Sequence, residues 1–182
     1  MSEIMRLVVT GTVGAGKSTF IRTISEIEAV DTDRAATDET ALLKRRTTVA
    51  FDFGRLRFSP EMVLHLYGTP GQERFDFMWD LLIRKAHAYI LLVAAHRPRE
   101  FRAARRVLNF MEHRVEIPMI VGITHCDCPG AWSTENIALA LGYDEERERP
   151  PMVTLDANQP AEVMGALIVL LEHLLSRVMA AC

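Results

Sequence analysis

Cysteine and net charge are both scarce in this sequence. Three cysteines occur in 182 residues, and two of them, Cys126 and Cys128, are separated by a single residue. This number and spacing exclude a disulfide framework and suit a reducing compartment, so we expect a cytoplasmic protein. The formal net charge of −3 gives no general attraction to polyanions, which argues against a nucleic-acid partner.

The sequence also lacks long hydrophobic runs and lipid-anchor signals. Its longest apolar segment near the end, 166–171, is followed by Glu172 and His173, so we predict no transmembrane segment. Met1-Ser2 excludes N-myristoylation, and Cys182 stands last rather than fourth from the end, where prenylation would require it. We therefore expect contact with a membrane only through partner proteins.

Short apolar runs alternate with helix-like segments along the chain. The runs have the continuous apolar character of buried parallel strands, and they span 4–10, 62–67, 88–95, 117–124 and 152–155. Segments with apolar residues at helical spacing are expected to form helices at 17–27, 72–86, 99–114, 134–141 and 161–179. The segment 49–58 leads through Ser59-Pro60 into the next strand without room for a helix, so it should run antiparallel to the others.

The order of these elements predicts a single α/β domain over residues 1–182. We expect a six-stranded sheet, five strands parallel and one antiparallel, with helices on both faces. A chain of 182 residues is long enough for one well-buried core and short for two. The polar segment 31–46 has little periodicity and is expected to be a long surface loop.

A phosphate-binding motif follows the first predicted strand. The segment Gly11-Thr12-Val13-Gly14-Ala15-Gly16-Lys17-Ser18 fits G-x-x-x-x-G-K-[ST] and continues through Thr19 into a predicted helix. Glycines let backbone N–H groups turn toward a β-phosphate, the helix N-terminus favours an anion, and Lys17 brings a full charge to the β- and γ-phosphates. The Ser18 hydroxyl is the expected ligand of Mg²⁺. The sequence therefore predicts a P-loop NTPase fold that binds a nucleoside triphosphate.

The segment 67–75, Tyr-Gly-Thr-Pro-Gly-Gln-Glu-Arg-Phe, resembles switch II of the Ras-like small GTPases. In that family a glycine N–H meets the γ-phosphate and a glutamine orients the attacking water, and Gly71 and Gln72 match those positions. Thr48, with Thr47 as the alternative, resembles the switch I threonine that reaches Mg²⁺ beside Ser18. The resemblance implies GTP hydrolysis; its catalytic residues would be Gln72, Lys17 and Thr48.

Two further segments resemble the guanine-binding loops of the same family. Thr124-His125-Cys126-Asp127 stands where the family has Asn-Lys-x-Asp, whose carboxylate accepts two hydrogen bonds from guanine. Leu155-Asp156-Ala157-Asn158 stands where a backbone N–H meets the guanine carbonyl. The implied contacts of GTP or GDP are Gly11, Val13, Gly14, Ala15, Gly16, Lys17, Ser18, Thr19, Thr48, Gly71, Thr124, His125, Asp127, Asp156, Ala157 and Asn158. A metal site at 125–128 is less favoured, because no second Cys/His cluster completes it.

Several positions depart from the Ras-like pattern. Gly68 replaces the aspartate that opens switch II and supports Mg²⁺, so the metal should bind more weakly or use Asp52 instead. Val13 places a branched side chain beside the γ-phosphate, which predicts slow intrinsic hydrolysis. Thr124 shortens the bridge to the P-loop and His125 removes a lysine stem from the base plane, which would lower nucleotide affinity and relax guanine selectivity.

The Tyr-Gly-Thr-Pro-Gly-Gln and Thr-His-x-Asp motifs resemble a prokaryotic branch of these GTPases, including those of actinobacterial conservon operons. That resemblance implies a roadblock/LC7-domain partner. An arginine finger, which adds roughly 10³- to 10⁵-fold in rate, would come from a partner. Arg45, Arg46 and Arg74 are alternatives within the chain, although each is better explained as a solvated charge.

Two surface features have open interpretations. Phe75, Phe77, Met78 and Trp79 would form either an effector surface or a packed cluster under the adjacent helix. Arginines at helical spacing, Arg99, Arg102 and Arg106, are better explained as a solvated helix face than as a docking patch.

Together these patterns predict a GTP-binding molecular switch that slowly hydrolyses GTP to GDP in intracellular signalling or polarity regulation. One alternative is a guanine-nucleotide-binding scaffold with weak or no catalysis. A weaker alternative is an ATP-using P-loop enzyme such as a small kinase, which would need an acceptor site and lid arginines and would have no evident use for the Gly-Gln-Glu-Arg-Phe segment.

Overall fold

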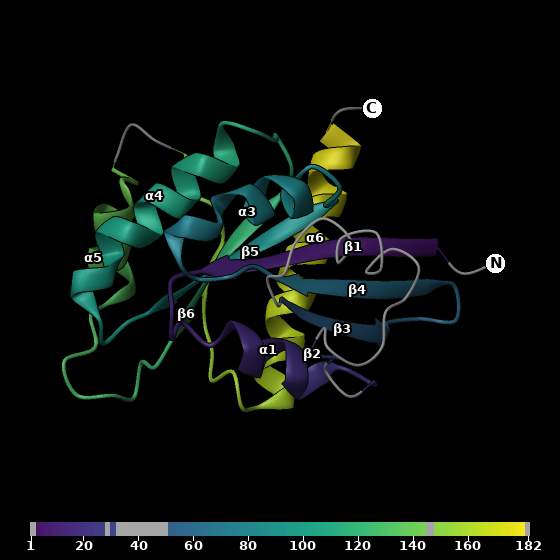
Figure 1. Cartoon of the computed structure of the whole chain (residues 1–182), viewed down its shortest axis with the longest axis horizontal. Helices are drawn as coiled ribbons and strands as arrows, with labels where there is room; N and C mark the ends of the chain where they lie inside the picture. The colour runs from purple at the N-terminus through teal and green to yellow at the C-terminus, as the bar shows by residue number, and fades with distance from the viewer. Residues whose placement is uncertain (1–2, 28–29, 32–50, 145–147, 181–182) are drawn as a thin grey trace.

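The computed structural model describes residues 3–27, 30–31, 51–144 and 148–180, and within them a single mixed sheet forms the centre of the molecule (Figure 1). Its strand order is β2-β3-β4-β1-β5-β6-β7. The strands are β1 (Glu3–Gly11), β2 (Val30–Asp31), β3 (Asp52–Arg57), β4 (Met62–Gly68), β5 (Ala88–Ala94), β6 (Met119–Thr124) and β7 (Met152–Thr154). The six predicted strands are confirmed, and two-residue β2 extends the edge beside β3.

Strand directions also agree with the prediction. β1 pairs in parallel with β4 on one side and β5 on the other, and β6 and β7 continue this direction. β3 is antiparallel to β4, with Asp52 opposite Gly68. The tight connection through Ser59 and Pro60 leaves no length for a crossover helix, so the chain can only reverse there.

Helices cover both faces of the sheet (Figure 1). They are α1 (Lys17–Ile24), α3 (Asp76–Ile83), α4 (Phe101–Glu112), α5 (Thr134–Leu141) and α6 (Pro160–Ala180), with short 3₁₀ turns η1 (Glu73–Phe75) and η2 (Pro98–Glu100) before α3 and α4. α1 ends earlier than predicted, because Ser25 turns into an extended conformation. The start of the predicted helix 72–86 is η1 rather than α-helix.

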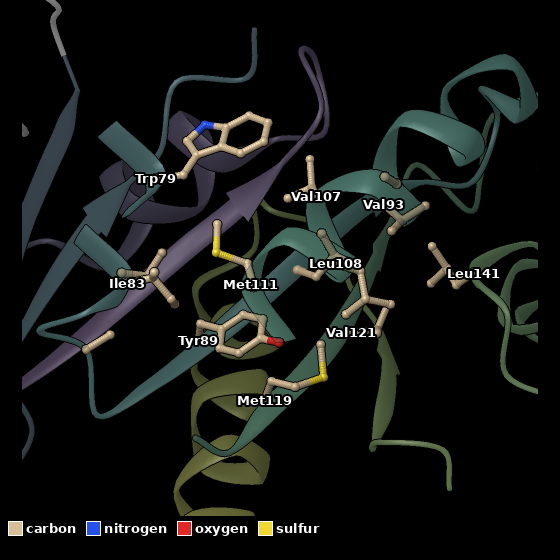
Figure 2. Close-up of a cluster of buried hydrophobic side chains, with 14 of the residues drawn as sticks. Trp79, Ile83, Tyr89, Val93, Val107, Leu108, Met111, Met119, Val121 and Leu141 are labelled. Carbon is tan, nitrogen blue, oxygen red and sulfur yellow. The ribbon is translucent and has the colours of Figure 1, made fainter. Parts of the chain in front are cut away.

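The core consists of two apolar layers separated by the sheet. Along β1, Val8 points to the layer under α3, α4 and α5, whereas Leu7 and Val9 point to the layer under α1 and α6, as the period of two along a strand requires. Figure 2 shows the first layer, with Leu108 and Met111 of α4 lying over the sheet.

Helix α6 combines a buried face with an apolar exposed end. In the described part of the chain it is the one helix whose length and mean hydropathy of 1.7 would suffice to cross a bilayer. Val163, Leu167, Leu170 and Leu171 recur at helical spacing and are buried. Val178 continues this spacing but is 54% exposed, so the packed face stops before the end of the helix.

The topology gathers five loops at one edge of the sheet, four of which carry the motifs predicted to bind a nucleotide. Segments 11–16, 69–72, 95–97, 125–127 and 155–158 each begin where a parallel strand ends, and parallel strands share their carboxyl edge. The predicted loop 31–46, together with Arg45, Arg46, Thr47 and Thr48, lies outside the described residues except for Asp31.

Candidate functional site

The loop after β1 has the backbone of an anion cradle. Gly11, Gly14 and Gly16 have positive φ angles of 144°, 77° and 100°, conformations that L-residues with a Cβ rarely adopt. Gly16 is the N-cap of α1, and no side-chain hydrogen bond caps the helix there among the described residues. The first N–H groups of α1 are therefore available to an anion.

Lys17 lies inside this loop and is 8% exposed. Its Nζ donates hydrogen bonds to the carbonyls of Gly11, at 2.8 Å, and Thr12, at 2.7 Å. Burial lowers the pKa of Lys17 to about 8, and the nearby Asp52 carboxylate opposes that shift. Two carbonyl oxygens thus bind the ammonium group from one side, but they do not fully offset the cost of burying its positive charge. An anionic ligand would offset the rest of that cost.

Ser18 and Asp52 meet below the loop, although they lie on different elements. The Ser18 hydroxyl donates a hydrogen bond to Asp52 Oδ2. A Cβ at Gly68 would lie 3.1 Å from Asp52 Cβ and 2.9 Å from Ile21 Cδ1, so Asp52 and Ile21 already fill the space beside Gly68. The carboxylate expected on β4 is therefore replaced in space by one from the neighbouring strand β3.

The segment after β4 lies directly against the P-loop. The Thr69 N–H donates to the Val9 carbonyl at 3.0 Å, and the indole N–H of Trp79 donates to the Pro70 carbonyl at 2.7 Å. A Cβ at Gly71 would lie 2.8 Å from the Val13 nitrogen and 2.9 Å from Lys17 Nζ. Only glycine allows this approach, and it places the Gly71 backbone over the phosphate end of the loop.

A small cavity of about 220 Å³ lies between these segments. It is lined by Val13, Gly14, Lys17, Ser18, Phe51, Asp52, Gly68, Thr69, Pro70 and Gly71. Gln72 is exposed and follows directly, at the start of η1. The structure thus brings the predicted phosphate and metal residues together, except for Thr48, which lies outside the described residues.

A second, larger pocket of about 440 Å³ adjoins the loop on its other side. It is lined by Gly16, Thr19, Thr124, His125, Cys126, Asp127, Cys128, Thr154, Leu155, Asp156, Ala157, Asn158 and Glu162. These residues come from α1, from the end of β6 and from the loop after β7. The two segments predicted to contact a base, 124–127 and 155–158, therefore form one concave surface together with Gly16 and Thr19.

Thr124 and His125 connect this pocket to the P-loop. The Thr124 hydroxyl donates to the Ala15 carbonyl at 2.8 Å, so the shortened side chain still bridges the two loops. His125 Nδ1 lies 2.9 Å from the same hydroxyl oxygen. Because the hydroxyl proton is directed to Ala15, Nδ1 must be the donor. His125 has a φ of 58°, a left-handed conformation unusual for a residue with a Cβ.

The loop after β7 is held by its own hydrogen bonds. The Asp156 carboxylate accepts from the backbone and the side-chain nitrogen of Asn158, both at 2.9 Å, and these bonds hold the pKa of Asp156 below its usual value. The Thr23 hydroxyl of α1 donates to the Ala157 carbonyl at 2.6 Å. Asp156 therefore fixes the conformation of this loop, and Ala157 and Asn158 line the pocket beside it.

The sequence analysis did not single out Arg97, which also touches the P-loop. Arg97 follows β5, and its Nη1 lies 3.4 Å from the Val13 carbonyl oxygen. The ring of the preceding residue, His96, lies 4.7 Å from that of His125. The only signal in the sequence was position, since both residues follow the carboxyl end of a parallel strand.

The remaining surface predictions have mixed outcomes. Of the predicted aromatic cluster, Met78 and Trp79 are buried in the core, whereas Phe77 is 43% exposed. Core packing therefore explains Met78 and Trp79 but not Phe77. Arg74 lies over the ring of Phe75, 4.6 Å from its centroid. Arg106 forms an ion pair with Glu73 of η1 at 2.5 Å. No group of three metal-ligating side chains occurs within the part of the chain that the structure describes.

Comparisons with known proteins agree with a nucleotide site. A family model described as "conserved hypothetical ATP binding protein" matches residues 27–177. An uncharacterized protein of Methanocaldococcus jannaschii is similar to this chain, with 28% identity over 92 residues. This match covers 50% of the chain and 51% of the relative, so the chain spans about half the length of the curated relative it matches. The family match begins after the P-loop, whose assignment depends on its own residues and geometry.

The lowered pKa of Lys17 predicts that phosphate binding depends on pH. With a pKa of about 8 in the free protein, Lys17 is charged below pH 7 and increasingly neutral above pH 8, and only the charged form attracts phosphate. The Kd for a nucleoside triphosphate should therefore be flat from pH 6.5 to 7.5 and rise above pH 8 by up to about tenfold per unit. Calorimetry at pH 8.5 should show proton uptake on binding.

A Lys17→Met variant is the control for this pH dependence. It should bind more weakly at every pH, without the rise in Kd and without the proton uptake. An equally steep rise in the variant would assign the titration to another group.

Proposed function

Since this chain belongs to the family of conserved hypothetical ATP-binding proteins, and is therefore a nucleotide-binding P-loop protein, we propose that it is a Ras-like switch that binds GTP and hydrolyses it slowly to GDP. The observation that carries the choice of base is Asp127 in the pocket beside the P-loop.

An ionised carboxylate only accepts hydrogen bonds. Guanine offers two adjacent donors, N1–H and the exocyclic amine, whereas adenine offers an acceptor, N1, beside its single amine. Asp127 therefore pairs with guanine and repels the ring nitrogen of adenine. A site built around such a pair discriminates by roughly 10⁴- to 10⁵-fold. His125 presents its ring near the base and replaces the stacking stem that a lysine would supply.

ATP is the second candidate, because the family's description names it. An ATP site would need a hydrogen-bond donor facing adenine N1. Two of the side-chain donors in the lining are already used within the protein, because the Thr124 proton is directed to Ala15 and one Asn158 N–H to Asp156. Thr19, His125 and Thr154 also line the pocket, so the preference for guanine depends on the Asp127 carboxylate, which only accepts hydrogen bonds.

Exchanging Asp127 for asparagine should change the preferred base. The new amide would offer one donor and one acceptor, which match the N1–H and C2 carbonyl of xanthine. Each lost charge-assisted hydrogen bond contributes about 1.5–3 kcal/mol, so Asp127→Asn should weaken GDP binding by at least about 10²-fold and strengthen binding of xanthosine diphosphate. Titration of purified, nucleotide-free protein with GDP, ADP and xanthosine diphosphate measures both effects.

Asp144→Asn, after the end of α5, is the matched control and should leave all three affinities unchanged. Wild-type protein that binds ADP as tightly as GDP would overturn the guanine assignment and favour the ATP candidate. Loss of GDP binding in Asp127→Asn without a gain for xanthosine would show only that the pocket had collapsed.

We propose that Ser18 and Asp52 support Mg²⁺ in the phosphate cavity. Hydroxyl and carboxylate oxygens are the ligands that this cation prefers, and it commonly keeps several waters. Ser18 would coordinate the ion directly, and Asp52 would orient a water bound to it. Gly68 cannot do this, because it has no side chain. Mg²⁺, when bound, neutralises charge on the β- and γ-phosphate oxygens. Thr48 is the further proposed ligand from the segment outside the described residues.

An Asp52→Asn variant should need more Mg²⁺ to retain its nucleotide. Removing a group that orients a metal's water shell costs about 10- to 100-fold in metal affinity. The Mg²⁺ concentration that half-maximally slows GDP dissociation should therefore rise by at least about tenfold, whereas GDP affinity in excess EDTA should stay the same. Fluorescent-nucleotide release during Mg²⁺ titration measures this shift.

The reciprocal exchange, Asp52→Gly together with Gly68→Asp, is the matched control, because it returns a carboxylate to the same space from β4. It should recover part of the Mg²⁺ dependence. An unchanged Mg²⁺ midpoint in Asp52→Asn would remove Asp52 from the metal site.

The proposed reaction is in-line attack of water on the γ-phosphate. Gln72 orients the water, Gly71 donates its backbone N–H, and Lys17 with the loop N–H groups stabilises the charge that spreads over the phosphate oxygens. The Val13 backbone lies against Gly71, and its side chain is 54% exposed; in the proposed complex this branched side chain would narrow the space for Gln72. Slow turnover without a partner follows from this crowding.

A Gln72→Ala variant separates the enzyme from a non-hydrolysing scaffold. Multiple-turnover phosphate release should fall by at least about tenfold, since orienting the attacking water is a transition-state effect, and GDP affinity should stay within about twofold. Phosphate release that is equally slow in both proteins, at saturating GTP and Mg²⁺, would favour the scaffold. A cytoplasmic signalling role and a roadblock/LC7-domain partner remain part of the proposal.

A further inference from the structure

Arg97 occupies a place on the P-loop that the proposed function does not use. It lies between β5 and η2, and its side chain extends across the outer surface of the loop. A Cβ at Gly14 would lie 2.3 Å from Arg97 Nη1 and 3.1 Å from Cζ. The guanidinium therefore rests on Gly14 itself, and any other residue at that position would displace it.

This guanidinium has no acidic partner in the described part of the chain. Its contacts there are the Val13 carbonyl oxygen, 3.4 Å from Nη1, and His96 Nε2, 3.4 Å from Nε. Some other surface arginines pair with carboxylates, as Arg84 and Arg114 do with Asp80. A cation that has no carboxylate partner and lies beside an anion-binding loop is placed to form an ion pair with an anionic ligand.

His96 orients the arginine. Burial, and the charges of His125 and Arg97, lower the pKa of His96, so its ring stays neutral and Nε2 can accept from Arg97 Nε. The ring also packs against His125 of the base pocket. The arginine is thus held at the side of the loop that joins the base pocket to the phosphate cavity.

Arg97 contacts the peptide that joins Val13 and Gly14. In a trans peptide, the carbonyl of Val13 and the N–H of Gly14 point in opposite directions. If the Gly14 N–H faces a phosphate, as the P-loop motif implies, Arg97 lies one peptide away from it. Arg97 is exposed, so its long side chain can turn over the glycine without breaking core packing.

We propose that Arg97 is an arginine finger supplied by the chain itself, whose guanidinium leaves the Val13 carbonyl and binds the terminal phosphate of a bound nucleoside triphosphate. This inference rests on the proposed triphosphate site. The planar guanidinium can donate two parallel hydrogen bonds to phosphate oxygens, and it would stabilise the charge that develops there during hydrolysis. The in-chain candidates from the sequence, Arg45, Arg46 and Arg74, are not required for this contact.

The test compares Arg97→Ala, Arg97→Lys and the neighbouring control Arg99→Ala in the full chain. Affinities are measured for GDP and for a non-hydrolysable GTP analogue, together with single-turnover hydrolysis of GTP and thermal stability. Arg97→Ala should lose about tenfold in affinity for the analogue and at least about tenfold in hydrolysis rate, with GDP affinity within about twofold. Arg97→Lys should recover part of the analogue affinity, and Arg99→Ala should match wild type.

Two results would overturn the inference. Equal loss of GDP and analogue affinity would show that Arg97 acts only on the shape of the loop through the Val13 carbonyl. Unchanged affinities and rate would show that it does not reach the nucleotide. If wild-type protein binds GTP without hydrolysing it, the proposed hydrolysis fails, and the ratio of analogue to GDP affinity still decides the role of Arg97. If adenine nucleotides bind instead, ADP and an ATP analogue provide the same ratio.

Discussion

The buried ammonium group of Lys17 is the interaction on which the site depends. Two carbonyls of the loop, from Gly11 and Thr12, hold it from one side, and they can do so only because glycines let the backbone turn around it. Burial makes this charge unfavourable by itself, which is why the pKa is depressed. A bound phosphate group would supply the missing negative charge. The anion-binding site therefore consists of β1, the loop after it and the first turn of α1.

The second constraint is the distribution of carboxylates around that cation. β4 ends at Gly68, and the space beside this glycine is occupied by Asp52 and Ile21. Asp52 lies opposite Gly68 in the β3–β4 ladder, and its carboxylate reaches Ser18 from there. The negative charge beside the P-loop therefore comes from β3.

The sequence predicted the fold well because the central strands β5 and β6 are buried along their whole length. Their continuous apolar runs and the tight turn at Ser59-Pro60 fix the number of strands and their directions, and the P-loop motif follows β1 as expected. The apolar spacing of α6 continues to the exposed Val178, because periodicity along a helix does not show where its packing partner ends. The edge strand β2 is too short to leave a pattern.

The candidate site was predictable where it follows a motif and not where it depends on proximity across the sheet. Asp52 was considered only because Gly68 left a gap, and nothing in the sequence indicated that Thr124 would still reach the Ala15 carbonyl. Arg97 and His96 carry no motif, since their contacts with Gly14 and His125 arise from the order of β1, β5 and β6 in the sheet. Contacts of this kind become visible only when the chain is folded.

The hydrogen bond between Ser18 and Asp52 joins two elements that are far apart in the sequence. Ser18 stands in the first turn of α1, directly after Lys17, and Asp52 begins β3. Because a carboxylate binds a hydroxyl more strongly than a neutral acceptor does, this single contact ties the start of α1 to β3. A change of charge beside Ser18 would therefore act on β3 directly, without passing through the core.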